Sequence, residues 1–164
     1  MKLPYRVTVF TDGSANASSR NGGYAFRIDC KNGSLEHGEG VRDTTNNRME
    51  LSACINSLIW CKALGIKHIN LYTDSMYTKN GIEKWCKGWA ANGWRKADNH
   101  PVINKDLWIK LIGINKSLDV SWNWVKAHQS KTHQSKTHQL NNIVVDGNSV
   151  VDALANKYRL ELDK

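Results

Sequence analysis

Five short segments of the chain have the hydrophobic pattern of β-strands. Residues 6–11 (RVTVFT) form a nearly continuous apolar and β-branched run, as expected of a central strand. Strand-like patterns recur at 24–29, 35–41, 67–73 and 120–125. A turn signal, Lys-Asn-Gly, separates the second and third segments, so the first three strands are predicted to form an antiparallel meander.

Helical periodicity marks the segments between and after these strands. The longest predicted helix spans 45–64 and ends at Gly65. Its apolar stripe consists of Leu51, Cys54, Ile55, Leu58 and Cys61. This helix connects the third strand to the fourth by a crossover, which predicts that the fourth strand runs parallel to the first. The order predicts an α/β fold in one domain, 1–164: a mixed five-stranded sheet, three antiparallel strands then two parallel additions, flanked by helices.

The region after the fourth strand is predicted to be an interrupted helical segment that is strongly basic. Gly81, Gly88 and Gly93 are expected to break its helical pattern. Cations and indoles interleave through 79–100, which we interpret as a basic protrusion: Lys79, Lys84, Trp85, Lys87, Trp89, Trp94, Arg95 and Lys96. A further amphipathic helix is predicted at 104–114, with Trp108 packed inward.

A repeated pentapeptide follows the fifth strand. The sequence HQSKT begins at His128, occurs twice in succession, and starts a third time. Because no packed element has such a low-complexity sequence, we expect an exposed loop inserted at about 128–147. A turn is predicted at 146–147, and the last helix is expected to begin at 148 or 149.

Composition excludes several classes of protein. The 164-residue chain is 40% apolar, and no apolar run reaches the ~20 residues of a membrane span. The N-terminus lacks the apolar core of a signal peptide, so we expect a soluble, non-secreted, cytoplasmic protein. None of the four cysteines has zinc-site spacing, and plain buried thiols suit a reducing compartment. We expect a monomer without membrane contact.

The net charge of +8 and the pI near 9.4 favour a polyanionic partner, of which nucleic acid is the commonest. A merely basic soluble protein is the alternative, because composition alone does not identify the partner. The positions of the acidic residues therefore carry more information than the net charge.

Four acidic residues are placed so that together they predict a metal site. Asp12 and Asp74 follow the first and fourth strands in the related tripeptides TDG and TDS. If those strands are parallel neighbours, both carboxylates lie at the same edge of the sheet. Glu50 lies in the first turn of the long helix, and Asp152 lies near the start of the last one. A single Asp at a strand end is usually a turn residue, so the prediction depends on the whole set.

The chemistry of such a set is that of a hard cation. Clustered carboxylates repel one another unless a cation neutralises them. Oxygen ligands without His or Cys select Mg²⁺ or Mn²⁺. Two such ions about 4 Å apart can stabilise both the attacking and the leaving oxygen of a phosphodiester. In a basic chain, this combination suggests metal-dependent phosphoryl transfer.

Five segments, in this order and spacing, closely resemble ribonuclease H of type 1: YRVTVFTDGS, TTNNRMELSA, INLYTDSMY, WVKAH and NSVVDALAN. The resemblance covers almost the whole chain except the repeat. It implies the ribonuclease H-like fold and an endonuclease that hydrolyses the RNA strand of an RNA–DNA hybrid, leaving 5′-phosphate and 3′-hydroxyl ends. It also implies two Mg²⁺ ions per site, with Mn²⁺ as a substitute, held by Asp12, Glu50, Asp74 and Asp152.

The same resemblance implies residues that assist catalysis or contact the hybrid. His128 matches a mobile histidine that helps proton transfer or product release, and a pKa near neutrality suits such shuttling. His133 and His138 have identical neighbours in the sequence and are alternatives. The implied nucleic-acid contacts are Thr45, Asn46, Asn47, Tyr77, Trp85, Lys87, Trp89, Lys96 and Asn104. For Trp89 and Trp94, core packing is the alternative interpretation.

Two other functions compete with this one. A non-catalytic hybrid-binding module could keep the fold, although an intact set of carboxylates argues against it. A DNA-directed relative, such as a resolvase or integrase, would share the acids but would not need the paired asparagines before Glu50 or the basic Trp-rich segment. Cleavage of hybrid, cleavage of DNA duplex, or binding alone would distinguish the three.

Overall fold

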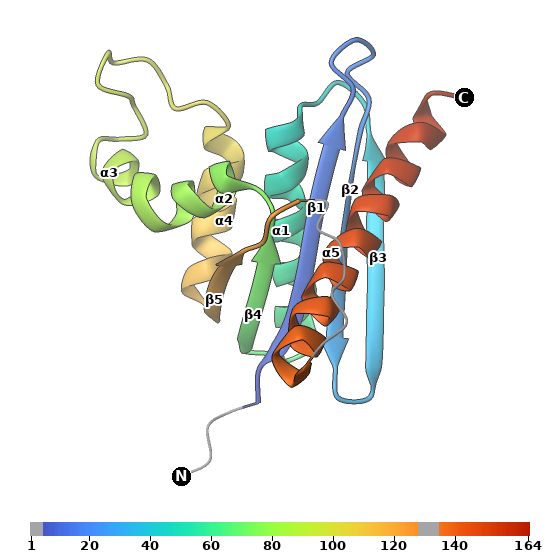
Figure 1. Cartoon of the computed structure of the whole chain (residues 1–164). Coiled ribbons are helices and arrows are strands. Elements are labelled where there is room, and N and C mark those ends of the chain that lie inside the picture. Colours follow the sequence, from blue (N-terminus) through green and yellow to red (C-terminus); the bar gives the residue numbers. More distant parts are fainter. Residues whose placement is uncertain (1–4, 128–134) are drawn as a thin grey trace.

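The computed structural model describes residues 5–127 and 135–164 and contains one mixed sheet with the strand order β3-β2-β1-β4-β5 (Figure 1). The strands are β1 (Val7–Ala15), β2 (Gly22–Cys30), β3 (Gly33–Val41), β4 (His68–Thr73) and β5 (Asp119–Trp124). β1 pairs with β2, and β2 with β3, in antiparallel orientation, whereas β4 is parallel to both β1 and β5. The predicted mixed five-stranded sheet is confirmed.

Strand β1 is longer than the sequence pattern predicted. Its parallel pairing with β4 ends at Phe10 opposite Tyr72, but its antiparallel pairing with β2 continues to Ala15 opposite Gly22. Asp12 therefore lies within the strand and not after it. Because Asp12 is two residues past the last parallel pair, its carboxylate still lies at the edge where β4 ends.

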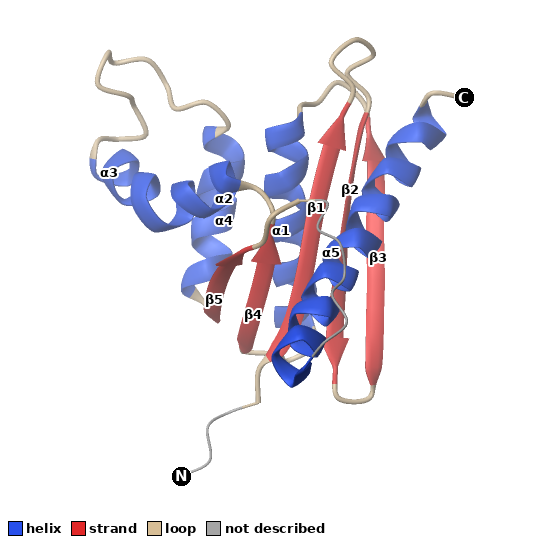
Figure 2. Cartoon of the chain, viewed as in Figure 1, coloured by secondary structure: helices blue, strands red, loops and turns tan. Residues whose placement is uncertain are grey.

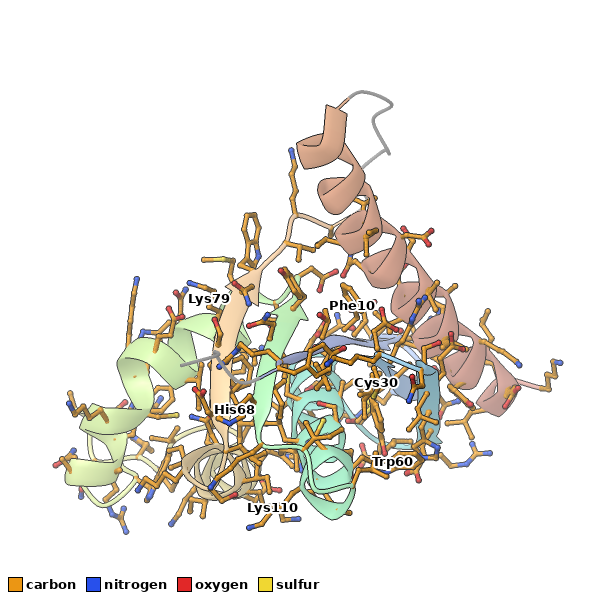
Figure 3. The ribbon with its side chains drawn as sticks, turned by 90° about the horizontal axis from the view of Figure 1, so that it is seen from below. Phe10, Cys30, Trp60, His68, Lys79 and Lys110 are labelled. Carbon is orange, nitrogen blue, oxygen red and sulfur yellow. The ribbon has the colours of Figure 1, made fainter. Side chains whose placement is uncertain are left out.

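The helices cover both faces of the sheet (Figure 2). They are α1 (Asn46–Ala63), α2 (Met76–Asn80), the π-helix η1 (Gly81–Trp85), α3 (Cys86–Ala91), α4 (Lys105–Lys116) and α5 (Ser135–Leu162). Figure 3 shows the sheet with α5 on one face and with α1 and α4 on the other. Helix α5 packs on β1, β2 and β3, while α1 packs on β1, β2 and α4.

The two faces of the sheet bury two apolar clusters. The apolar stripe of α1 is buried between the sheet and α4, and Trp108 on α4 is fully buried there, as predicted. Gly81 lies against the Trp108 indole so closely that a Cβ would overlap the ring. On the other face, Phe10, Ala25, Val151 and Ala155 form a small cluster beneath α5.

The segment from Met76 to Ala91 is more regular than predicted. Of the three glycines expected to break it, Gly81 marks the change from α- to π-helix, and Gly88 lies within α3. Gly93 alone lies beyond the helical residues, with a positive φ of 65° that a glycine adopts without strain. The segment projects from the body of the molecule at the left of Figure 1.

The prediction of an exposed loop through residue 147 is wrong from Ser135 onward, because α5 begins there. No turn forms at 146–147, and neither Asn148 nor Ser149 is a cap. The turn-forming residues are overridden by packing: Val145, Asn148 and Val151 continue the buried face of the helix. Gly147 lies against the Phe10 ring, where a Cβ would come within 2.5 Å. The first part of the repeat, 128–134, lies outside the described residues.

Candidate active site

Three carboxylates from separate elements converge at the end of β4. Asp12 on β1, Glu50 on α1 and Asp74 after β4 each offer an oxygen, and these atoms lie within 4.8 Å of one another. Asp152 on α5 lines the same cavity, which has a volume of about 440 Å³. Its lining residues are Asp12, Gly13, Asn46, Asn47, Glu50, Asp74, Ser75, Met76, Tyr77, Ala127 and Asp152. The four predicted acids therefore share one cavity.

The start of α1 brings Glu50 to the cavity. Thr45 is the N-cap, with its hydroxyl accepting from the Arg48 N–H at 3.2 Å. Asn46 and Asn47 are therefore the first helical residues, and Glu50 lies at the end of the first turn, close to where it was predicted, and is only 8% exposed. The Asn46 side-chain oxygen accepts a hydrogen bond from the Ala15 N–H, which ties α1 to the end of β1.

The turn after β4 holds Asp74. Ser75 caps α2, with its hydroxyl accepting from the Thr78 N–H at 3.1 Å. The Ser75 N–H in turn donates to the Thr73 hydroxyl at 3.0 Å. Asp74 thus lies between a buried strand residue and a helix cap, which are both fixed by local hydrogen bonds.

Burial and mutual repulsion make the carboxylates unfavourable as a group of anions. Burial, together with the charge of Asp74, raises the pKa of Asp12 from its ordinary 3.8 to about 8. Burial and the neighbouring Asp12 also raise the pKa of Glu50 well above its usual range. Among the described residues, Glu50 Oε2 is one of two buried side-chain polar atoms without a hydrogen-bond partner. An all-oxygen donor set of this kind fits a hard divalent cation.

We predict that the metal-free protein loses stability as the pH rises from about 4 to 8. The folded state holds the Asp12 proton more tightly than the unfolded state, so its stabilising effect is greatest at low pH and is lost as the pH passes the folded pKa of about 8. Melting temperatures measured in EDTA across this range test the prediction. The Asp12→Asn variant should show a smaller fall, and an identical pH profile in that variant would contradict it.

A contact between β1 and α5 was not anticipated from the sequence. The Ser14 hydroxyl, two residues after Asp12, donates to the Asn156 side-chain oxygen at 3.1 Å. Asn156 lies four residues after Asp152, and so on the same face of α5. The four-residue spacing of Asp152 and Asn156 would have indicated that they share a helix face, if the start of α5 had been predicted correctly. The contact fixes the face of α5 that carries Asp152.

A second cavity of about 240 Å³ lies beside the first, in the protrusion. It is lined by Tyr77, Trp85, Trp89, Lys96, Val102 and Ile103. Tyr77 borders both cavities, and its hydroxyl accepts from the Trp108 indole and the Asn104 amide, both at 3.1 Å. Trp85 and Trp89 therefore line a groove in addition to packing on one another, with ring centroids 5.7 Å apart.

Of the remaining predicted contacts, Thr45 and Asn104 are linked to one another, whereas Lys87 lies apart from both cavities. Arg48 joins Thr45 to Asn104: its backbone N–H bonds the Thr45 hydroxyl, and its guanidinium lies 3.3 Å from the Asn104 oxygen. Lys87 is exposed on α3 and is not part of the lining of either cavity. His128, His133 and the side chain of His138 lie outside what the structure describes.

A cluster of carboxylates beside a groove lined by indoles and a lysine, on a mixed α/β sheet, is the arrangement expected of a metal-dependent nuclease. The RNase H family model matches residues 4–159, and the chain therefore belongs to the RNase H family.

Similarity to individual proteins agrees with this assignment. The chain is 40% identical over 162 residues to a ribonuclease H of Francisella tularensis subsp. novicida, covering 98% of this chain and 95% of that protein. LC9-RNase H1, a type 1 RNase H with the type 2 active-site motif, superimposes with a TM-score of 0.76 at 22% identity, over 97% and 74% of the two chains. LC11-RNase H1, solved with an RNA/DNA hybrid, gives 0.68 at 15% identity, over 97% and 100%.

Within the described residues, no helix is both long and apolar enough to cross a membrane. The four cysteines all lie in the described part of the chain and form no disulfide.

Proposed function

We propose that this protein is an endoribonuclease that hydrolyses the RNA strand of RNA–DNA hybrids and leaves 5′-phosphate and 3′-hydroxyl ends. The observation that carries the proposal is the set of carboxylates, three of them within 4.8 Å, in a cavity shared with Asp152. We assign Asp12, Glu50, Asp74 and Asp152 as ligands of two Mg²⁺ ions. Such ions supply an activated water and neutralise charge on the leaving oxygen.

The paired asparagines are proposed to bind the RNA strand beside the metal ligands. Asn46 and Asn47 line the same cavity as the acids. Because the Asn46 oxygen already accepts from the Ala15 N–H, its NH₂ group remains as a donor. Amides that donate and accept are suited to base edges and 2′-hydroxyls in the minor groove, which distinguish RNA from DNA.

The groove of the protrusion is proposed to hold the DNA strand. The rings of Tyr77, Trp85 and Trp89 offer flat apolar faces for sugars, and Lys96 and Lys87 offer cations for phosphates. Thr45 and Asn104, joined through Arg48, are assigned to a backbone phosphate of the same strand. The two cavities would then hold the two strands of one hybrid, with Tyr77 between them.

We propose that His128 assists proton transfer or product release, with His133 and His138 as alternatives. His128 directly follows Ala127, which lines the catalytic cavity. An imidazole with an ordinary pKa can exchange protons near neutral pH. We further propose that the protein acts as a monomer. We also propose a reducing, cytoplasmic compartment, because all four of its thiols are unpaired.

The function is tested with end-labelled RNA annealed to DNA, incubated with the protein and Mg²⁺, with and without EDTA. Single-stranded RNA, RNA duplex and DNA duplex serve as comparison substrates. Cleavage restricted to the RNA of the hybrid, and abolished by EDTA, is the expected result. Binding without cleavage would replace the proposal with a hybrid-binding module, and cleavage of DNA duplex would replace it with a DNA-directed nuclease.

We predict that Lys96→Ala weakens hybrid binding. The plot of log affinity against log salt, which falls with salt, should become less steep by about one, as expected when one phosphate contact is lost. Lys110→Ala is the matched control, because Lys110 is exposed on α4 and belongs to the lining of neither cavity (Figure 3). Filter binding across a salt series measures both quantities. Equal slopes for the two variants would remove Lys96 from the interface.

A further inference from the structure

The end of β5 holds the turn that carries Asp74. The Val125 N–H donates to the Thr73 carbonyl at 2.9 Å, directly before Asp74. The Trp124 indole N–H then donates to the carbonyl oxygen of Asp74 itself at 3.1 Å. Two successive carbonyl groups, of Thr73 at the end of β4 and of Asp74 after it, are thus held by the last residue of β5 and by the residue that follows it.

The two tryptophans of β5, Trp122 and Trp124, have different surroundings and different hydrogen-bond partners. Trp122 packs against the main apolar cluster, and its indole donates to the Asn115 side chain at 3.1 Å. Trp124 is 44% exposed, so much of its ring remains in contact with water. An exposed indole gains less from the hydrophobic effect than a buried one, which leaves the hydrogen bond to Asp74 as its distinguishing contact.

The hydrogen bond restricts the peptide group that follows the Asp74 side chain. The Asp74 carbonyl belongs to the peptide plane shared with Ser75, whose side chain caps α2. With the carbonyl held by Trp124 and the next residue held by the cap, rotation about the Asp74 backbone is limited. The backbone sets the direction of the Asp74 Cα–Cβ bond and so limits where its carboxylate can reach, and one of its oxygens lies within 4.8 Å of those of Asp12 and Glu50.

We propose that Trp124 is a positioning residue for the metal site: its indole N–H fixes the peptide of Asp74 and thereby aims the Asp74 carboxylate at the shared cation. This inference rests on the proposed function, in which Asp74 is a metal ligand. Trp124 itself touches no reacting atom. Its contribution is to the affinity of the site for Mg²⁺.

The test compares Trp124→Phe with Trp122→Phe. Both variants lose one indole N–H on the same strand, but only the first loses a bond to Asp74. Isothermal titration calorimetry with Mg²⁺ should show a dissociation constant raised about tenfold in Trp124→Phe, the lower end of the effect typical of outer partners of metal ligands. In Trp122→Phe the dissociation constant should equal that of the wild type, even where its melting temperature in EDTA falls.

A second variant separates the hydrogen bond from the packing of the ring. Trp124→Leu also lacks the N–H but fills the space differently, so both Trp124 variants should share the weakened Mg²⁺ affinity despite different melting temperatures. Hybrid cleavage by both should return toward the wild-type kcat when Mg²⁺ is raised about tenfold. A wild-type Mg²⁺ affinity in either folded variant overturns the inference. Absence of hybrid cleavage by the wild type would instead overturn the proposed function, while the calorimetry would still decide the role of Trp124.

Discussion

Asp74→Asn should abolish cleavage of the hybrid while leaving the protein folded and able to bind it. The amide keeps the size of the side chain but removes the charge that a divalent cation requires from a carboxylate ligand. The expected loss in kcat/KM exceeds the roughly 10²-fold effect of outer partners of metal ligands. Single-turnover cleavage and hybrid binding, measured on the same preparation, test both parts of this expectation.

The stability of this variant gives an independent check. The charge of Asp74 helps to raise the pKa of its buried neighbour Asp12, so removing that charge relieves repulsion in the metal-free site. The melting temperature of Asp74→Asn in EDTA should therefore equal or exceed that of the wild type, and added Mg²⁺ should stabilise it less. A variant that unfolds at a much lower temperature would point to a structural role for Asp74.

Asp119→Asn provides the opposite pattern. Asp119 begins β5 at the far end of the sheet from Trp124, where it pairs with Arg6 at 2.6 Å and His68 at 2.9 Å. The hydrogen bonds from His68 and Arg6 lower the pKa of the Asp119 carboxyl. Its amide variant should melt at a slightly lower temperature and cleave the hybrid at the wild-type rate. Retained cleavage in Asp74→Asn, or lost cleavage in Asp119→Asn, would contradict the assignment of the metal ligands.

Much of this site was predictable because its acids follow strong local patterns. The apolar run of β1 and the crossover through α1 placed Asp12 and Asp74 at one edge of the sheet, and the structure has both there. The helical stripe of α1 likewise placed Glu50 at the start of a buried helix. The strand pattern of period 2 and the helix pattern of period 3.6 can be recognised in the sequence because each reflects the burial of one face of a single element.

The start of α5 was not predictable in the same way. The sequence 146–149 has the residue types of a turn and a cap, yet it lies within the helix. Gly147 is suited to the helix only because the Phe10 ring, 137 positions earlier in the chain, leaves no space for a Cβ. The contacts of Trp124 with Asp74 and of Ser14 with Asn156 have the same character, since they join residues 50 and 142 positions apart. Local propensity carries no information about such pairs.

The two tripeptides TDG and TDS differ in their third residue for a structural reason. After Asp74, Ser75 is the N-cap of α2 and needs a hydroxyl. After Asp12, the chain remains in β1 and passes directly against the backbone of α1. A Cβ on Gly13 would lie 2.5 Å from the backbone nitrogen of Glu50 and would also overlap the Met49 carbonyl group. The absence of a side chain at residue 13 is therefore what allows Asp12 and Glu50 to approach one another.

Gly13→Ala should for this reason damage both stability and metal binding. The added methyl group meets backbone atoms, which cannot rotate away, so β1 and α1 must separate. We expect a loss of about 3 kcal/mol, the upper part of the usual range for overpacking, or about 10 °C in melting temperature for a chain of this size. Thermal unfolding in EDTA measures the first effect, and calorimetric titration with Mg²⁺ measures the second.

Gly113→Ala is the matched control for this substitution. Gly113 lies within α4, and a Cβ there would meet no atom within 4 Å apart from its neighbours in the helix itself. Alanine should stabilise the helix by up to about 1 kcal/mol, without changing Mg²⁺ affinity, because it restricts the unfolded chain and favours the helix. Opposite signs for the two Gly→Ala changes would show that the close approach of β1 and α1 causes the loss at Gly13. A Gly13→Ala protein with wild-type stability and Mg²⁺ affinity would mean that this approach is not needed to bring Asp12 and Glu50 together.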